Sequence, residues 1–322
     1  MCTGSIFRRA FAALVLAAAP AVAGAVVVRD ADELILAVNN HASLIEVAGV
    51  IEFTTSYQGS DNALPPIRNF SIELLGRPGA EIRATGAGFR LAEVWSDGAV
   101  RMSNLTISGF KSGPSGGALW IEGGRLVADR VVFRGNESEL SGGAVQARLA
   151  GARIQVTDSL FEDNVAGRRG GAFSLHGIEA PTVFERNRFV DNQARFGCAL
   201  SIVDTDGGRF SDGVFRGGCE TSLVDLDTTG TGPDFFNNTW IANGSLAFRY
   251  RPHGDIEPSR ARMAGNVLVQ NAVSPSLCQG TVPGDGIESL GGNVATDASC
   301  DLDDPSDVVV ADPANILAEP DL

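Results

Sequence analysis

The feature that most constrains this chain is a repeat between Ser115 and Asn243. A Gly-Gly-Ala triplet begins at positions 116, 142 and 170, and Gly-Cys-Ala takes its place at position 197. A second mark, Phe-x-x-Asn, keeps the same spacing at Phe133, Phe161 and Phe189, and continues in degraded form at Phe215 and Trp240. Two marks that share one period of about 20 to 50 residues indicate an array of structural repeats.

The content of one repeat indicates which kind of array this is. Between Gly142 and Asn164 the chain has short segments with apolar residues at alternate positions, separated by Gly, Asp or Asn. That pattern is typical of strands, and no segment has helical spacing over ten residues. Leucine-rich repeats would need helical halves, and propeller blades would need a period of about 40 residues. The sequence therefore predicts an all-β solenoid, a parallel β-helix of about eight to ten coils.

Stacking of the coils explains the repeated residues. Equivalent positions in successive coils of a parallel β-helix lie about 4.8 Å apart, so inward side chains form columns. Asparagine at a turn tolerates left-handed backbone angles and bonds to the asparagine of the next coil, and paired glycines allow a tight bend. We therefore predict a structural stack that contains Phe133, Phe161, Phe189, Phe215 and Trp240 together with Asn136, Asn164, Asn192 and Asn243.

The repeats resemble those of a known family. The segments SGGALW, SGGAVQ and RGGAFS, with the intervening FRGN, FEDN and FVDN, are similar to the repeats of polymorphic outer-membrane proteins. This resemblance implies a right-handed parallel β-helix protein of a bacterial cell surface. Towards the end of the chain, Cys278, a Gly-Gly-Asn-Val segment, Cys300 and an Asp-Pro pair resemble the end of the secreted choice-of-anchor Q proteins. That second resemblance leaves the mode of anchoring open.

The ends of the chain are predicted to differ from the repeat. Residues 1–25 read as a signal peptide, because two arginines precede a short apolar run and small residues that suit cleavage after Ala23 or Ala25. No other stretch reaches 18 apolar residues, so we expect no membrane span in the mature chain. Residues 26–272 are assigned to the β-helix and residues 273–322 to a C-terminal cap or tail.

A short helix is expected at the start of the β-helix. The segment from Asp30 to Asn39 begins with an aspartate, has an acidic first turn and places Leu34, Ala37 and Val38 on one helical face. The end of an open sheet needs cover against further pairing. We therefore predict that this helix caps the N-terminal end.

The cysteines predict two disulfides. The segment from Cys198 to Asp206 matches the segment from Cys219 to Asp227 with an offset of 21 residues. If these are equivalent positions on adjacent coils, Cys198 and Cys219 lie about 5 Å apart, within the range of a disulfide. A secreted chain meets an oxidising environment. Cys278 and Cys300 then form the second pair, since the four cysteines of the mature chain pair without remainder.

The same match predicts a cluster of carboxylates. It places Asp204 on Asp225 and Asp206 on Asp227, and four carboxylates so close together suit Ca²⁺, which prefers hard oxygen ligands. The alternative is that these are solvated aspartates that end two strands. No other cofactor is expected.

Charge and motifs restrict the function. The net charge of −14 argues against nucleic acid or an anionic membrane as a partner. A glycoside hydrolase needs paired carboxylates around a cleft, and no such set is evident. The arginines Arg168, Arg169 and Arg195 lie in turns near Asp163 and Asp191, which is the nearest approach to a lyase site. No catalytic residue is assigned.

The function we predict from the sequence is binding or scaffolding. We expect a monomeric, secreted or cell-surface protein that acts without catalysis, as an adhesin-like binding module for glycans or surface proteins or as a structural scaffold. The alternative is a polysaccharide lyase or glycoside hydrolase on the same fold.

Overall fold

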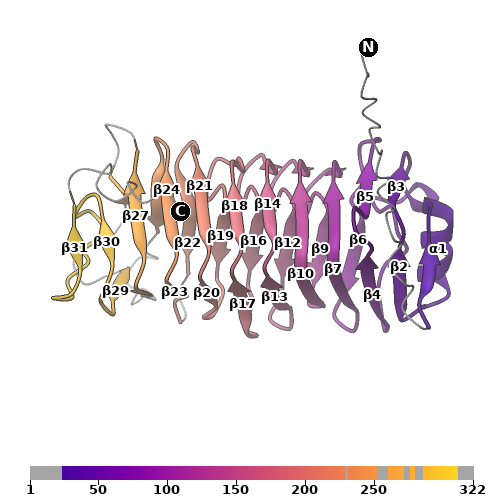
Figure 1. Ribbon diagram of the computed structural model, residues 1–322, viewed down its shortest axis with the longest axis horizontal. Coiled ribbons are helices and arrows are strands. Elements are labelled where there is room, and N and C mark those ends of the chain that lie inside the picture. The colour runs from indigo at the N-terminus through magenta and orange to yellow at the C-terminus, as the bar shows by residue number, and fades with distance from the viewer. Residues whose placement is uncertain (1–23, 229–230, 252–259, 272–275, 280–285, 311–322) are drawn as a thin grey trace, which may run out of the picture.

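The chain winds into a parallel β-solenoid of about 9 turns, as the computed structural model shows (Figure 1). The structure describes residues 24–228, 231–251, 260–271, 276–279 and 286–310. Within these ranges the strands of one coil pair in parallel with those of the next, and the coils follow one another along the long axis. The predicted all-β parallel β-helix is thus confirmed. The signal segment lies outside the described residues, apart from its last two positions.

Three sheets form the walls of the solenoid. The large sheet has 20 strands: β1 (Val26–Val28), β2 (Leu44–Val47), β3 (Val50–Phe53), β4 (Ser71–Gly76), β5 (Glu81–Ala84), β7 (Ala99–Ser108), β10 (Arg125–Arg134), β13 (Arg153–Thr157), β14 (Leu160–Glu162), β17 (Thr182–Glu185), β18 (Arg188–Val190), β20 (Arg209–Ser211), β21 (Val214–Gly217), β23 (Asp234–Phe236), β24 (Thr239–Ala242), β26 (Ala261–Ala264), β27 (Val267–Gln270), β29 (Ile287–Ser289), β30 (Val294–Ala295) and β31 (Val308–Val309). The second sheet has eight strands: β6 (Ala92–Trp95), β9 (Leu119–Glu122), β12 (Val145–Arg148), β16 (Phe173–His176), β19 (Leu200–Val203), β22 (Ser222–Asp227), β25 (Leu246–Tyr250) and β28 (Cys278–Gln279). The third sheet is formed by β8 (Lys111–Ser112), β11 (Glu137–Ser138) and β15 (Val165–Ala166).

A single α-helix among the described residues, α1 (Ala31–Asn39), lies at the N-terminal end of the stack (Figure 1). The Asp30 side chain accepts a hydrogen bond from the backbone N–H of Glu33 at 2.8 Å, which satisfies a free donor of the first turn. Leu34, Ala37 and Val38 are buried against the core. The helix therefore covers the first coil as predicted.

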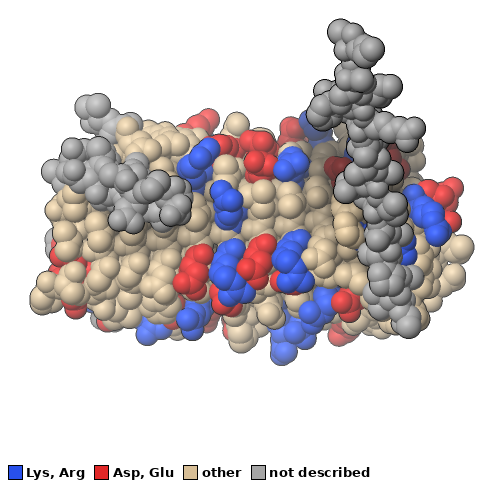
Figure 2. Space-filling view, in the orientation of Figure 1, with Lys and Arg blue, Asp and Glu red and all other residues tan. Residues whose placement is uncertain are grey.

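A corner of the large sheet carries residues in the left-handed region of backbone space. The positions follow the coil period, and their φ values lie between 51° and 56°: Asn104, Arg130, Asp158, Arg186, Asp212 and Asn237. Their side chains bond from coil to coil, with Arg130 Nε 2.8 Å from Asn104 Oδ1 and Arg186 Nε 2.7 Å from Asp158 Oδ1. Figure 2 shows basic and acidic side chains alternating along the long axis of the molecule. Polar and ionic contacts between successive coils thus link the side chains of this corner.

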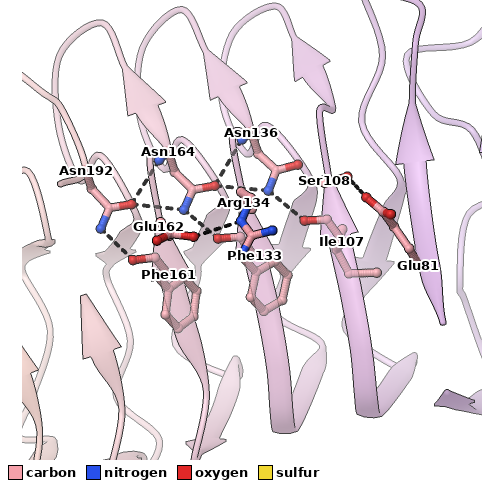
Figure 3. A network of polar contacts seen from close by, with 10 residues as sticks. All are labelled: Glu81, Ile107, Ser108, Phe133, Arg134, Asn136, Phe161, Glu162, Asn164 and Asn192. Atoms are coloured by element: carbon pink, nitrogen blue, oxygen red, sulfur yellow. Dashed lines mark hydrogen bonds and ion pairs between the residues drawn. The ribbon is translucent and has the colours of Figure 1, made fainter. Parts of the chain in front are cut away.

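An aromatic column and an amide ladder run through the interior (Figure 3). The Phe133 and Phe161 rings stack with centroids 5.0 Å apart, and the column continues through Phe189 and Phe215 to Trp240 at 4.9, 4.8 and 3.9 Å. In the ladder, Asn136 Nδ2 donates to Asn164 Oδ1 at 3.0 Å, and Asn164 Nδ2 donates to Asn192 Oδ1 at 2.9 Å. Both columns therefore hold the coils of Phe133, Phe161 and Phe189 in register.

The ladder does not extend to Asn243, contrary to our prediction. Asn243 is exposed, and its side chain accepts a hydrogen bond from Asn271 on the surface. Gly218 occupies the intervening coil and has no amide to bridge Asn192 to a later asparagine. A second buried amide ladder, not predicted from the sequence, instead continues towards the C-terminal end through Asn238, Asn266 and Asn293.

The paired glycines serve two different purposes. The first glycine of each pair has positive φ, as at Gly142 with 65°. The second glycine allows close approach of the next coil, because a Cβ atom on Gly143 would lie 2.0 Å from the carbonyl oxygen of Gly171. Only the first of these reasons was expected from the sequence.

Candidate functional site

The outward face of the second sheet carries a column of polar and aromatic side chains. The residues pair in register across neighbouring strands, and we call them the outer column: Trp120, Gln146, Ser174, Ser201, Asp225 and Arg249. On β9 the outward residues are partly exposed and alternate with buried ones. From β12 to β22 the outward residues of this column are buried as well, with Ser201 and Asp225 both 0% exposed. Other side chains must therefore cover this part of the face.

An arginine–aspartate cluster provides much of that cover. The Arg169 guanidinium reaches Asp227, 58 residues later in the chain, with a nitrogen–oxygen distance of 3.1 Å. Arg169 also lies 3.6 Å from Asp225. Arg251 pairs with both carboxylates, at 2.7 Å from Asp225 and 3.3 Å from Asp227. Arg249 lies 3.6 Å from Asp225. A buried carboxylate without such partners would strongly destabilise the fold. The arginines therefore compensate for the burial of the two aspartates.

Burial also acts on the arginines of the cluster. Desolvation lowers the pKa of the Arg249 guanidinium, and the nearby Asp225 carboxylate opposes this shift. Phe196 supports the same guanidinium groups, since Arg249 lies 4.4 Å and Arg251 5.3 Å from the centre of its ring. These distances are those of cation–π contacts. Phe196 follows Arg169 on the adjacent coil, so ring and cluster form one side of the face.

A hollow opens beside this cluster. It has a volume of about 260 Å³ and is lined by six polar residues and one apolar residue: Ser141, Gln146, Arg168, Arg169, Ser174, His176 and Val203. His176 Nε2 lies 3.9 Å from Asp204 Oδ2 at its edge. The hollow thus combines two arginines with several neutral hydrogen-bonding side chains.

The N-terminal part of the face carries two tryptophans. The Arg90 and Arg148 guanidinium groups lie 5.4 and 5.5 Å from the Trp120 ring, whose Nε1 donates to Glu122 at 2.9 Å. Trp95, on β6, has Arg68 at 3.8 Å from its ring centre. Both tryptophan side chains remain partly exposed. The face therefore offers aromatic surface on the strand next to the hollow, because Gln146 lines the hollow and pairs in register with Trp120.

The predicted stacking of the four aspartates is wrong. Ser201 pairs with Asp225 and Val203 with Asp227, so equivalent positions of these coils differ by 24 residues rather than 21. Asp204 is exposed beside His176, and Asp206 Oδ1 accepts a hydrogen bond from the backbone N–H of Thr231 at 3.2 Å. In the part of the chain that the structure describes, no group of three or more His, Cys, Asp or Glu side chains is arranged to hold a metal ion. Binding of Ca²⁺ stays a prediction without the geometry that motivated it.

Both predicted cysteine pairs are disulfides. Cys198 and Cys219 have a Cα–Cα distance of 5.9 Å, and Cys278 and Cys300 one of 4.9 Å. The backbone N–H of Cys198 bonds to the carbonyl of Ser222, so Cys219 lies three residues before the register partner of Cys198. The first disulfide therefore forms across a turn and not between stacked equivalents.

The lyase-like grouping of arginines and aspartates is not assembled between the described residues. Asp191 faces Arg216 at 3.5 Å, whereas Arg169 bonds to Asp225 and Asp227. Phe196, Arg249 and Arg251 were not predicted from the sequence to belong to a site. The outer column had a signal, because its members Trp120, Gln146, Ser174 and Ser201 each stand two residues after the alanine of a Gly-Gly-Ala or Gly-Cys-Ala triplet.

No protein-family model matches this chain, and no curated protein or solved structure is significantly similar to it. The resemblance to polymorphic outer-membrane repeats and to choice-of-anchor Q proteins therefore stays a prediction. Among the described residues, no helix is long and apolar enough to cross a membrane.

Proposed function

We propose that this protein is a secreted or cell-surface scaffold that binds glycans, without catalysis, on the outward face of its second sheet. The observation that carries the proposal is the combination of partly exposed Trp95, Trp120 and Phe196 with a hollow lined by hydrogen-bonding side chains. Ligand sites typically pair aromatic surface with a few oriented polar groups, and the apolar faces of sugar rings suit such surface. Two disulfides support an oxidising compartment.

The charges of the face favour binding over hydrolysis. A glycoside hydrolase needs one carboxyl group as a proton donor and a second one as base or nucleophile. Asp225 and Asp227 lie on β22 of this face, and each is ion-paired with Arg169 and Arg251. Asp225 is fully buried behind these ion pairs, so the cluster does not present two free carboxylates to a sugar.

The proposal is tested by measuring glycan binding to the mature protein and to a Trp120→Ala variant. An aromatic contact is worth about 0.5–1.5 kcal/mol beyond the buried area, so we expect affinity to fall roughly 10-fold. The matched control is Phe236→Ala, because Phe236 is a partly exposed ring on the large sheet with Arg209 at 5.5 Å. Calorimetry on a panel of oligosaccharides, read together with reducing ends and unsaturated products, covers both binding and turnover.

Three results would count against this proposal. Product formation would favour the polysaccharide-acting enzyme. An equal loss of affinity in both variants would move the site away from the second sheet. Absence of binding throughout the panel would favour a structural stalk.

A further inference from the structure

We propose that the hollow beside β16 recognises a carboxylate group of an acidic polysaccharide, and that the exposed Arg168 makes the main contact with it. This inference rests on the proposed glycan-binding function, since the hollow opens on the same face. It adds the chemical class of the ligand and a specificity-determining residue.

The local charge differs from that of the whole chain. The protein has a net charge of −14, yet three arginines pair with Asp225 and Asp227 here, namely Arg169, Arg249 and Arg251, and Arg168 and Arg195 line the adjoining hollows. Two further carboxylates lie nearby. Asp204 is beside His176, and Glu220 lines a neighbouring hollow with Arg195. Counting all of these groups, the face keeps a positive excess in an otherwise acidic molecule, which favours an anionic ligand.

The two arginines of the hollow have different surroundings. Arg169 is ion-paired with Asp225 and Asp227, and its side chain is only 15% exposed. Arg168 is exposed, and within the described ranges no acidic side chain pairs with it. Its backbone is fixed, because its N–H donates to the Leu140 carbonyl at 2.8 Å and its carbonyl accepts from the N–H of Phe196 at 2.9 Å. Arg168 thus presents an unneutralised guanidinium group from a firmly held position.

The lining of the hollow suits a carboxylate. A guanidinium group binds carboxylate through two parallel hydrogen bonds, which gives both strength and direction. Gln146 and Ser174 offer neutral polar groups on the floor. The next residue of the outer column, Ser201, has a fully buried hydroxyl oxygen that bonds to no other described residue. Gln146 already donates to the carbonyls of Ala147 and Ser174, and Ser201 does not line the hollow, so the arginines provide the main contact for a carboxylate.

The aromatic surface and the hollow lie on neighbouring strands of one face. Trp120 on β9 and Ser174 on β16 are separated by the single strand β12. Two strand spacings amount to about 10 Å. The hollow thus extends from Gln146, which pairs in register with Trp120, to Ser174 one strand further on. An oligosaccharide with acidic sugars can contact Trp120 with one ring and place the carboxylate of another sugar in the hollow.

The test compares Arg168→Gln with Arg125→Gln. Both changes remove one exposed arginine, and Arg125 lies on β10 of the large sheet. The probes are a uronic-acid hexasaccharide, a sulfated dextran oligosaccharide and a neutral dextran oligosaccharide of similar length, measured by calorimetry at low and moderate salt. We expect Arg168→Gln to weaken binding of the uronic-acid probe about 10-fold or more, and Arg125→Gln to leave it within about twofold. Unchanged thermal unfolding of both variants verifies the fold.

Each other outcome overturns a defined part of the inference. If the neutral probe binds as tightly as the acidic one and Trp120→Ala still weakens it, the anion site is refuted while the glycan proposal survives. If the sulfated probe binds more tightly and loses more affinity in Arg168→Gln, the carboxylate assignment is replaced by sulfate. If no probe binds, the anion site and the glycan proposal both fail.

Discussion

An inward phenylalanine of this solenoid contacts aromatic rings on the coils before and after it. Phe161 stacks on Phe133 and Phe189 at 5.0 and 4.9 Å, and meets the edge of Phe173 at 6.0 Å. Its side chain is 0% exposed. Because successive coils lie only a few ångströms apart, a ring at this position contacts the equivalent rings of both neighbouring coils. Removing one ring therefore affects three coils.

We therefore expect Phe161→Ala to be among the most destabilising single changes in this chain. Removal of a buried phenylalanine typically costs about 3–5 kcal/mol, since the lost burial is accompanied by a cavity. Urea unfolding of the variant gives this free energy, and Phe161→Leu should cost clearly less. A loss no larger than that of Leu140→Ala, at a position with 48% exposure, would show that the ring does not support the core.

Single residues also show where sequence reasoning succeeds and where it fails. The period placed Phe161 and Asn164 in their columns, because parallel stacking converts a repeat in sequence directly into contact in space. The same logic failed for Asn243, where Gly218 interrupts the ladder one coil earlier. A column ends wherever one coil lacks the bonding group, and the position of the next asparagine does not reveal that.

At the scale of the element, the amide ladder is the unit that holds the coils in register. Asn164 accepts from the backbone N–H and the side chain of Asn136, and donates to the carbonyl of Phe133 and to Asn192. All of these groups are buried. The ladder therefore provides hydrogen bonds that the turning backbone cannot make for itself.

Asn164→Ala should consequently cost more than one ordinary hydrogen bond. It leaves buried partners on two coils unsatisfied, at about 1–3 kcal/mol for each group. Unfolding by urea, with the exposed Gln193→Ala as the control, measures the difference. Hydrogen exchange should also rise at the backbone N–H of Asn136, which bonds to Asn164 Oδ1 at 3.0 Å. Unchanged exchange at that amide would contradict the assigned role of the ladder.

Contacts between elements explain the failure of the aspartate prediction. The self-match with an offset of 21 residues aligned Asp204 with Asp225, whereas the strands pair Ser201 with Asp225. The coil that begins at Ser201 is shorter than the coil before it. A short sequence match cannot show which turn of that coil has fewer residues. The bond from Arg169 to Asp227 crosses an intervening coil, so no comparison of adjacent repeats would predict it.

At the scale of the whole molecule, arginines of neighbouring coils form ion pairs with part of the acidic side chains. The hydrogen bonds from Arg186 hold the pKa of the Asp158 carboxyl below its usual range, and those from Arg83 do the same for Glu52. Both carboxylates lie on the outer surface, and each pairs with an arginine of the next coil. Pairing from coil to coil thus recurs along the solenoid on a chain with net charge −14.

This arrangement predicts a loss of stability in acid. A carboxyl whose pKa is lower in the folded than in the unfolded state stabilises the fold at pH above its unfolded value, near 4, and this contribution disappears as the pH falls through the folded pKa. The melting temperature should therefore decrease as the pH is lowered below about 4.

Asp158→Asn should reduce the slope of the melting temperature against pH, because asparagine tolerates the positive φ of 51° at this position but cannot titrate. The exposed Glu139→Gln provides a control with the same change in charge. Melting curves between pH 2.5 and 7 at low and high salt measure the effect, which screening should weaken. Equal slopes for Asp158→Asn and the unmodified protein would show that this ion pair does not contribute to folding.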